Sequence, residues 1–237
     1  MSQSVQAFDF DAEYGRQYDQ FIRQIIPGYE SYFELCLALF AESLGARGNL
    51  LVAGCGTGSE LVCFAREKPG WNLTGVDLSP QMLEFCRLKL AAVGLVAGPD
   101  QMIRLIAGDV AQLPREEFDG ITSNLVMHFV RGEKSKLEFL RGLKNNLKPG
   151  GLLVLMDACW EKGHGFQRVM RAWWEFGKAR GLAEEKWLSF REDFEKGLHP
   201  LTRDQQQNLL HQAGFQDVYP FWSSLHHQAF VARNPVA

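Results

Sequence analysis

The sequence predicts an α/β fold in which a mostly parallel sheet carries helices on both faces. From residue 49 to residue 158, apolar runs of strand length alternate with segments of helical periodicity. After residue 201, one helical segment precedes two apolar runs that only a short link separates. Such a pair predicts an antiparallel hairpin at the edge of the sheet.

The central elements follow in chain order. Strands are predicted at 49–54, 71–77, 102–108, 118–125 and 152–158, and helices at 58–68, 80–93 and 133–147. Ser79 and Pro80 open the second of these helices as a capping residue and a first-turn proline. The turn at 149–151, Pro-Gly-Gly, is expected to lead into the strand at 152–158.

The two ends of the chain are expected to add helices around this core. Two aromatic-rich segments, 163–180 and 184–196, have helical character, and a further helix runs from its N-cap Thr202 to Gly214. Strands at 218–224 and 226–233 complete the hairpin. We predict a single domain over 1–237. Its parts are an N-terminal helical cap (1–48), a core (49–158), a helical lid insert (159–200), and a final helix and hairpin (201–237).

Composition excludes several classes of protein. The net charge is −3 and no stripe of Lys or Arg is present, so no nucleic-acid partner is expected. No apolar stretch reaches the roughly 18 residues of a membrane span, and the N-terminus lacks the apolar core of a signal peptide. The five cysteines form no C-x-x-C pair, which favours reduced thiols and a cytoplasmic protein over a metal or disulfide framework. The composition is compatible with both a monomer and a homodimer.

A glycine-rich turn follows the first strand. Gly54, Cys55, Gly56 and Gly58 form a G-x-G-x-G pattern, and glycine at these positions lets a ligand approach backbone N–H groups. Serine stands at position 59, where a dinucleotide fingerprint would need glycine, so a nicotinamide dehydrogenase is a disfavoured alternative.

Two carboxylates end the next two strands. Asp77 lies 21 residues after Gly56, where it can accept hydrogen bonds from ribose hydroxyls. Asp109 is expected within reach of an adenine edge, and Val110 can cover the base. Because ligands of open α/β sheets bind at the carboxyl ends of the strands, these features together predict a nucleoside site.

The segments LLVAGCGTGSE, TGVDLSPQML, AGDVAQLP, FDGITSNLVMHFV and LKPGGLLVLMD occur in the order found in class I S-adenosylmethionine-dependent methyltransferases. The chain resembles this family over about residues 49–158. The resemblance implies a Rossmann-like seven-stranded sheet with its last strand antiparallel. It also implies S-adenosylmethionine as cofactor and S-adenosylhomocysteine as product. Leu78 and Met82, in the segment after Asp77, are counted among the cofactor contacts. One departure is Ala53, where many members carry an acidic residue.

A closer resemblance links FDFDAEYGRQYDQFIRQIIPGYE, SNLVMHFV and HQAGFQDVYPFW to carboxy-S-adenosylmethionine synthases and nearby small-molecule methyltransferases. By motif it assigns cofactor contacts to Tyr29 and Asn124. The carboxylate-binding arginine of the synthases falls near Arg191, among residues that match poorly. The synthases also lack the middle glycine that Gly56 supplies here. Methyl transfer to a small-molecule acceptor is therefore the preferred function, with the synthase reaction and a non-catalytic cofactor-binding protein as alternatives.

The acceptor site is expected beneath the lid. Methyl transfer from a sulfonium needs an acceptor held in line and shielded from water, and a base only when the acceptor is a weak acid. His128, which follows the fourth strand, is the candidate base. The candidate acceptor contacts come from the helical cap and the lid: Tyr18, Arg171, Trp174 and Arg191. No metal is expected, and neighbouring strand positions such as His226 and His227 face opposite sides of a sheet.

Overall fold

Seven strands form one sheet with the order β3-β2-β1-β4-β5-β7-β6 in this computed structural model. The structure describes residues 12–99, 101–161, 163 and 165–236, and gives the backbone alone at 12–14 and 16. The strands are β1 (Gly48–Ala53), β2 (Trp71–Asp77), β3 (Ile103–Ala107), β4 (Phe118–Asn124), β5 (Leu147–Ala158), β6 (Gln216–Ser224) and β7 (His227–Arg233). Only β7 runs against the others, which confirms the predicted mostly parallel sheet with an antiparallel last strand.

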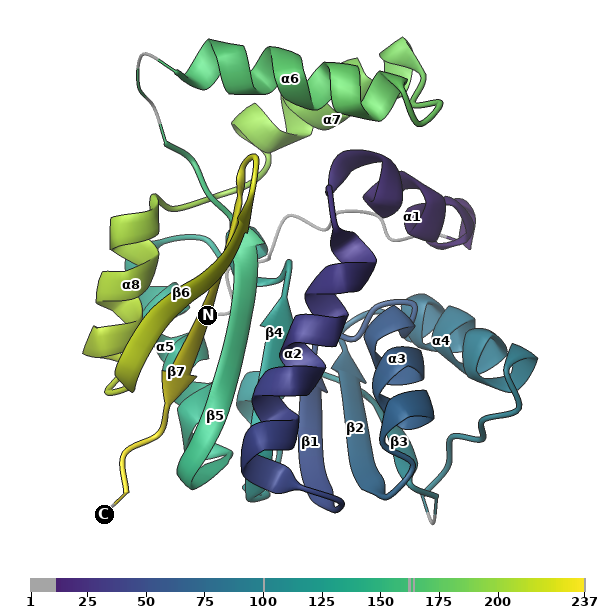
Figure 1. Cartoon of the computed structure of the whole chain (residues 1–237), viewed down its shortest axis with the longest axis vertical. Coiled ribbons are helices and arrows are strands. Elements are labelled where there is room, and N and C mark those ends of the chain that lie inside the picture. The colour runs from purple at the N-terminus through teal and green to yellow at the C-terminus, as the bar shows by residue number, and fades with distance from the viewer. Residues whose placement is uncertain (1–11, 100, 162, 164, 237) are drawn as a thin grey trace.

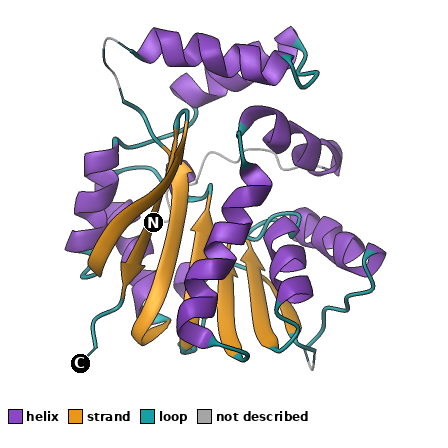
Figure 2. Cartoon of the chain, viewed as in Figure 1, coloured by secondary structure: helices purple, strands orange, loops and turns teal. Residues whose placement is uncertain are grey.

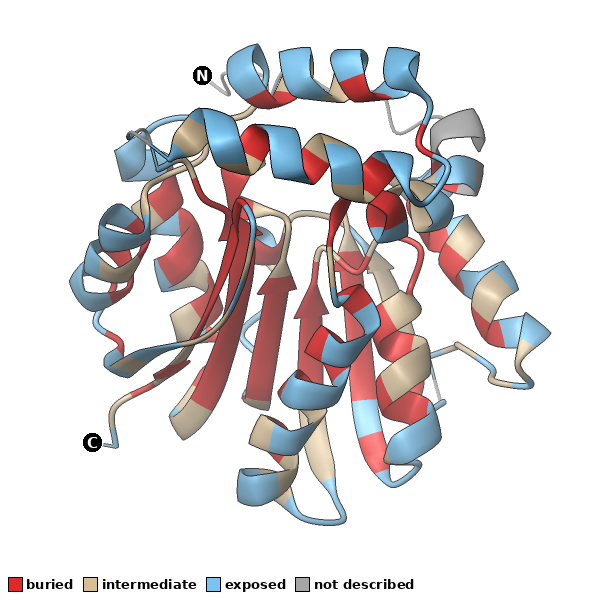
Figure 3. Cartoon of the chain, turned by 45° about the horizontal axis from the view of Figure 1, so that its top comes forward, coloured by how far each residue is buried: buried red, intermediate tan, exposed pale blue. Residues whose placement is uncertain are grey.

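Helices cover both faces of the sheet and its carboxyl edge (Figures 1 and 2). The helices are α1 (Ala12–Ile25), α2 (Tyr29–Leu44), α3 (Ser59–Glu67), α4 (Pro80–Ala92), α5 (Glu133–Asn145), α6 (Phe166–Lys178), α7 (Glu184–Lys196) and α8 (Arg203–Gln212), with short turns η1 (Val110–Gln112) and η2 (Met127–Phe129). Helices α2, α3 and α4 pack on one face and α5 and α8 on the other, each with its own apolar cluster. Figure 3 shows the buried strands between these layers, with α6 and α7 lying across the top.

The strand order reverses direction at β1. The chain moves from β1 outward to β2 and β3, and then returns to β4 on the other side of β1. In doubly wound sheets such a switch point opens a crevice at the carboxyl ends of the two central strands. The glycine turn after β1 lies at this point.

Side-chain caps begin two of the predicted helices. The Ser79 hydroxyl accepts a hydrogen bond from the Met82 amide, with Pro80 in the first turn of α4. Thr202 and Gln205 form a reciprocal capping box at the start of α8. Both cap predictions are confirmed.

Among the strand boundaries that differ from the prediction, those of β5 and β7 have a visible structural reason. Strand β5 begins at Leu147 instead of residue 152, because Leu147 pairs with Phe118 and a register shift absorbs the Pro-Gly-Gly segment before Leu152 pairs with Gly120. Strand β7 begins at His227, so His226 lies in the hairpin turn rather than in the strand, after Leu225 at a φ of 50°.

The N-terminal segment contributes α1 and α2, while residues 1–11 lie outside the described part of the chain. In the described residues no helix combines the length and the apolar character that crossing a membrane requires.

The lid insert is held by one fully buried indole. The Trp173 ring packs edge-on against Trp187, Phe190 and Phe194 of α7, with centroids 5.2 to 5.6 Å away. Its Nε1–H donates to the Ile25 carbonyl at the end of α1 at 2.5 Å. Trp173 therefore ties the lid to the N-terminal helix.

Candidate functional site

The three glycines of the turn after β1 do different things. All three have positive φ, between 50° and 81°. A Cβ atom on Gly54 would lie 2.2 Å from the Val126 side chain, and one on Gly58 would lie 2.4 Å from Cys86 Sγ. A Cβ atom on Gly56 would meet nothing within 4 Å. Gly54 and Gly58 are thus required by packing, whereas Gly56 faces open space into which a ligand can approach.

Asp77 contacts this turn directly. Its Oδ2 accepts a hydrogen bond from the Gly56 amide at 2.8 Å, and its Oδ1 accepts one from the Ser79 amide at 2.9 Å. Burial raises the pKa of this carboxyl, and the two backbone amides oppose that rise. Each carboxylate oxygen still has a lone pair, so the group can accept further hydrogen bonds from a ligand.

The other predicted nucleoside contacts line the ends of β2 and β3. Leu78 is exposed beside Asp77, whereas Met82 is buried. Asp109 caps η1 by accepting from the Ala111 amide at 2.9 Å, and Val110 is buried next to it. The turn-capping function of Asp109 is thus present, and its contact with an adenine ring stays a prediction.

A buried polar network ends β4. Asn124 accepts a hydrogen bond from the Tyr32 hydroxyl at 2.7 Å and donates one to Glu60 Oε2 at 3.0 Å. Glu60 is 6% exposed, and its other oxygen has no partner. Burial raises the pKa of Glu60 to about 7, and the hydrogen bond from Asn124 opposes that rise. The network places a carboxyl group of raised pKa behind the glycine turn.

Tyr29 and Cys55 lie in the same buried region. Burial, followed by the negative charge of Glu60, raises the pKa of the Tyr29 hydroxyl. The Cys55 thiol has a raised pKa because it is hydrogen-bonded to Cys86 and buried. Both groups are therefore neutral at physiological pH, which makes Cys55 unsuited to nucleophilic chemistry.

A charged cluster fastens α1 to the glycine turn. Asp19 accepts a hydrogen bond from the Thr57 hydroxyl at 2.6 Å, and its other oxygen lies 2.5 Å from Lys89 Nζ. Lys89 also donates to the hydroxyls of Thr57 and Ser59, both at 2.8 Å. The N-terminal helix is thereby held against the beginning of α3.

His128 is buried and paired with Asp157 at the end of β5. The ring Nδ1 contacts Asp157 Oδ1, which also accepts from the Ala158 amide at 2.7 Å. Asp157 is completely buried, and its Oδ2 has no partner. A carboxylate bonded to Nδ1 fixes the orientation of an imidazole and stabilises its protonated form, as a general base requires.

The predicted acceptor contacts are spread over the N-terminal helix α1 and the lid helices α6 and α7. Tyr18 is partly buried against the cluster shared by α2 and α6, and the Trp174 ring lies 5.9 Å from that of Trp187. Arg171 is exposed on α6, and Arg191 is exposed on α7, where its Nε lies 2.9 Å from Glu195 Oε1. The structure thus brings the glycine turn, Asp77 and Asn124 together, while the two arginines occupy exposed helix faces.

Sequence reasoning missed the residues that act through tertiary contacts: Asp19, Lys89, Tyr32 and Glu60. No local motif marks them, although a glutamate two positions after the last glycine of the turn was a visible signal in the sequence. Across the described residues no group of three or more His, Cys, Asp or Glu side chains is arranged to hold a metal ion.

Comparisons with known proteins agree with this geometry. Residues 51–155 match the methyltransferase domain family. The chain is 25% identical over 226 residues to the carboxy-S-adenosyl-L-methionine synthase of Campylobacter jejuni strain 81-176, covering 95% of this chain and 93% of the relative. It is also 25% identical over 231 residues to the synthase of Desulfotalea psychrophila, covering 96% of this chain and 92% of the relative.

Solved structures show the same fold. A SAM-dependent methyltransferase from Aquifex aeolicus superposes with a TM-score of 0.63 at 17% identity, covering 95% of this chain and 99% of that one. The strand order, the glycine turn bonded to Asp77 and the matched family domain lead to one conclusion. The chain carries a methyltransferase domain over residues 51–155, and S-adenosylmethionine is its cofactor.

Proposed function

We propose that this enzyme transfers the methyl group of S-adenosylmethionine to a small-molecule acceptor bound between the sheet edge and the α6–α7 lid. The observation that carries the proposal is the contact between Asp77 and the Gly56 amide. It joins the carboxylate predicted for the ribose to the turn predicted for the amino-acid part of the cofactor. Both groups therefore serve one ligand lying across the carboxyl ends of β1 and β2.

The residues present fit this cofactor. The open space over Gly56 leaves room for the ligand beside the turn. Asp77 retains acceptor capacity for the ribose hydroxyls, and exposed Leu78 offers an apolar surface beside it. When bound, S-adenosylmethionine supplies a methyl group already activated by the positive charge on its sulfur.

The protein then has to orient the acceptor, remove its proton and exclude water. We propose that His128 removes the proton of the acceptor. Because Asp157 holds its Nδ1, its Nε2 is the atom that accepts that proton. The aromatic packing of α6 and α7 covers the edge of the sheet and excludes water from it. Tyr18 and Trp174 are proposed to line the acceptor side, with Arg171 and Arg191 at its rim.

Synthesis of carboxy-S-adenosylmethionine is the second candidate function. The two relatives named above are named as synthases of this compound, and the similarity to this chain covers 93% and 92% of their lengths. Two features favour methyl transfer. Gly56 is present in the turn, and Arg191, the nearest equivalent of the carboxylate-binding arginine, is exposed and paired with Glu195. We further propose that the chain forms one cytoplasmic domain and has no nucleic-acid partner. Both a monomer and a homodimer are compatible with this function.

Mass spectrometry of the ligand that co-purifies with the protein separates the two reactions. We expect S-adenosylmethionine or S-adenosylhomocysteine, and a carboxylated cofactor would replace our assignment with the synthase. Transfer of labelled methyl from S-adenosylmethionine to a small-molecule extract fraction tests catalysis itself. Cofactor binding without transfer across exhaustively fractionated extract would support a non-catalytic binding protein.

A further inference from the structure

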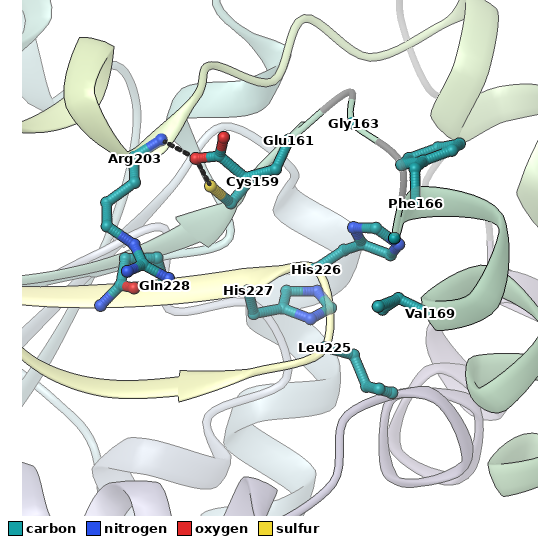
Figure 4. Close-up of a pocket in the computed structure, with 11 residues that line it drawn as sticks. Cys159, Glu161, Gly163, Phe166, Val169, Arg203, Leu225, His226, His227 and Gln228 are labelled. Carbon is teal, nitrogen blue, oxygen red and sulfur yellow. Dashed lines mark hydrogen bonds between the residues drawn. The ribbon is translucent and has the colours of Figure 1, made fainter.

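Buried titratable side chains with an unpartnered atom occur at the hairpin tip and behind the glycine turn. Figure 4 shows the first of these places, where His226 and His227 lie at the tip of the β6–β7 hairpin. Burial lowers the pKa of both imidazoles, so the rings are neutral and need no compensating charge. The second place holds the carboxyl group of Glu60, whose Oε1 is buried and unpartnered. A carboxyl group can ionise there only at a cost, unless a positive charge lies nearby.

The chain supplies no cation to Glu60. Within the described ranges, its Oε2 accepts one hydrogen bond, from Asn124 Nδ2 at 3.0 Å, and its Oε1 accepts none. No Lys, Arg or His charge of those residues acts on its pKa. Because a buried charge needs a compensating charge close to it, a ligand has to supply that charge.

The titratable groups around Glu60 stay neutral at pH 7. Its charge acts on phenols and thiols of α2, α3 and the glycine turn: Tyr29, Tyr32, Cys36, Cys63 and Cys55. Burial raises the pKa values of all five groups, and at Cys55 the hydrogen bond to Cys86 is the larger cause. From β4, the neighbour is the uncharged amide of Asn124. In this cluster it is therefore Glu60 that titrates near neutral pH.

Asn124 connects Glu60 to the cofactor crevice. The register of β1 and β4 places Asn124 level with Gly54, where the glycine turn begins. Asn124 is partly exposed, whereas Glu60 and Tyr32 are buried. The polar network therefore leads from the crevice into the core.

Glu60 also decides how the Asn124 amide is turned. Asn124 Nδ2 donates to Glu60 Oε2, and Asn124 Oδ1 accepts from the Tyr32 hydroxyl at 2.7 Å. A hydroxyl can donate or accept, whereas an ionised carboxylate only accepts, so the carboxylate fixes the side on which the amide nitrogen lies. Asn124 Oδ1 retains a second lone pair, which can accept a hydrogen bond from a ligand.

An ammonium group matches both requirements. It carries N–H donors for Asn124 Oδ1 and a positive charge for Glu60, whereas a sulfonium has the charge but no donor. The amino-acid part of the cofactor carries an ammonium group, and this part is the one predicted to lie against the glycine turn. Glu60 Oε1 is buried, so the carboxylate acts through Asn124 and across a short distance rather than by contact. In surroundings of low polarity a charge acts strongly over several ångströms.

We propose that Glu60 is the positioning residue and counter-charge for the ammonium group of the cofactor. It turns the Asn124 amide so that Oδ1 accepts from that group, and its negative charge balances the positive one. The inference rests on the cofactor site of the proposed function and does not depend on the acceptor.

The protonation of Glu60 makes the inference measurable. Burial raises its pKa to about 7, so about half of the carboxyl groups hold a proton at pH 7. A bound ammonium group lowers that pKa, and the proton leaves to the buffer on binding. Affinity should therefore rise with pH up to about 7 and level off above about 8.

Calorimetric titration of S-adenosylhomocysteine in buffers of different ionisation enthalpy counts the protons that binding releases. For the full-length wild type at pH 7 we expect roughly half a proton per site, and an affinity at least about threefold higher at pH 8 than at pH 6. The matched ligand is the analogue of S-adenosylhomocysteine in which hydrogen replaces the α-amino group. It should release less than about a tenth of a proton and bind at least about tenfold more weakly.

Variants assign the proton to its side chain. Glu60→Gln keeps the shape and an acceptor for Asn124 but removes the charge. It should abolish the proton release and weaken S-adenosylhomocysteine at least about fivefold at pH 8. Glu67→Gln makes the same change on the exposed last residue of α3, and it should behave as the wild type in both measurements.

The wild type alone can overturn the inference, whether or not the variants fold. Absence of proton release with S-adenosylhomocysteine, or equal release with the analogue that lacks the amino group, would do so. Release with S-adenosylmethionine but not with S-adenosylhomocysteine would assign the charge to the sulfonium and would also overturn it. Failure of methyl transfer leaves these binding measurements intact, whereas failure of S-adenosylhomocysteine to bind would remove the cofactor site and this inference together.

Discussion

The two halves of the site are built by different means. On the cofactor side, Asp77 and the Gly56 amide are 21 residues apart, and backbone amides of a single turn make the contacts. On the lid side, Trp173 and the carbonyl of Ile25 are 148 residues apart, and aromatic packing holds α6 and α7 in place. The cofactor side is a backbone arrangement set by one short turn, whereas the lid side depends on aromatic packing between segments far apart in the chain.

This difference indicates which half of the site selects the acceptor. A fixed cradle for the cofactor serves any acceptor, so we expect substrate choice to come from the side chains of the lid side. Changes on the lid side should therefore alter stability and acceptor recognition, and changes at the turn should alter cofactor affinity.

Trp173→Ala is expected to have the largest effect. It removes a fully buried indole and leaves the Ile25 carbonyl without its donor, which should cost about 3–5 kcal/mol of unfolding free energy. Urea denaturation measures the loss. A cost below about 1 kcal/mol would mean that the lid is not held by this residue and would weaken the contrast between the halves.

The glycine turn supplies a matched pair. Gly58→Ala should destabilise by about 2–5 kcal/mol, because its Cβ would meet Cys86 Sγ and its φ is 81°. Gly56→Ala should cost only about 1–2 kcal/mol, since its Cβ meets open space. The order should invert for S-adenosylhomocysteine affinity among folded protein, with Gly56→Ala the weaker binder. Equal effects of both substitutions on stability would contradict the assigned packing.

Glu60→Gln tests the buried network behind the turn. Because the folded pKa of about 7 exceeds the unfolded value of about 4.5, the folded state binds more protons and loses stability as the pH rises through that window. Below pH 4.5 the glutamate carries no penalty, and above pH 7 the full penalty of about 3 kcal/mol applies. The variant should thus be more stable than wild type at pH 8 and similar to it at pH 4.

Thermal unfolding across pH 4–8 measures this difference. A stability difference that does not change with pH would exclude a raised pKa at Glu60.

Lys89→Met should have the smallest effect. It breaks the ion pair with Asp19 and the hydrogen bonds to Thr57 and Ser59, but the charges are about a quarter exposed, so the cost should stay near 1 kcal/mol. Wild-type stability should fall toward that of the variant as salt is raised. A cost above about 3 kcal/mol would make the α1 contact as important as the lid packing.

The sequence predicted the sheet, most helix boundaries and the glycine turn, because each depends on local periodicity, caps or a short motif. Strand β5 was expected to begin at 152 because the Pro-Gly-Gly signal was interpreted as a turn, while pairing with β4 extends the strand back to Leu147. Tyr32, Glu60 and Asn124 meet only in the folded chain, so their network could not be predicted. The exposed faces of Arg171 and Arg191 likewise depend on how α6 and α7 pack.

Calorimetric titration of S-adenosylhomocysteine into wild type, Asp77→Ala and Asp119→Ala tests the central claim most directly. Asp119 is the control, since its carboxylate also accepts a backbone hydrogen bond, from Asn49, but at the opposite edge of the sheet. Our account predicts binding to wild type and Asp119→Ala, and a loss of about 1–3 kcal/mol for Asp77→Ala. Unchanged affinity in Asp77→Ala would contradict a nucleoside held across the carboxyl ends of β1 and β2.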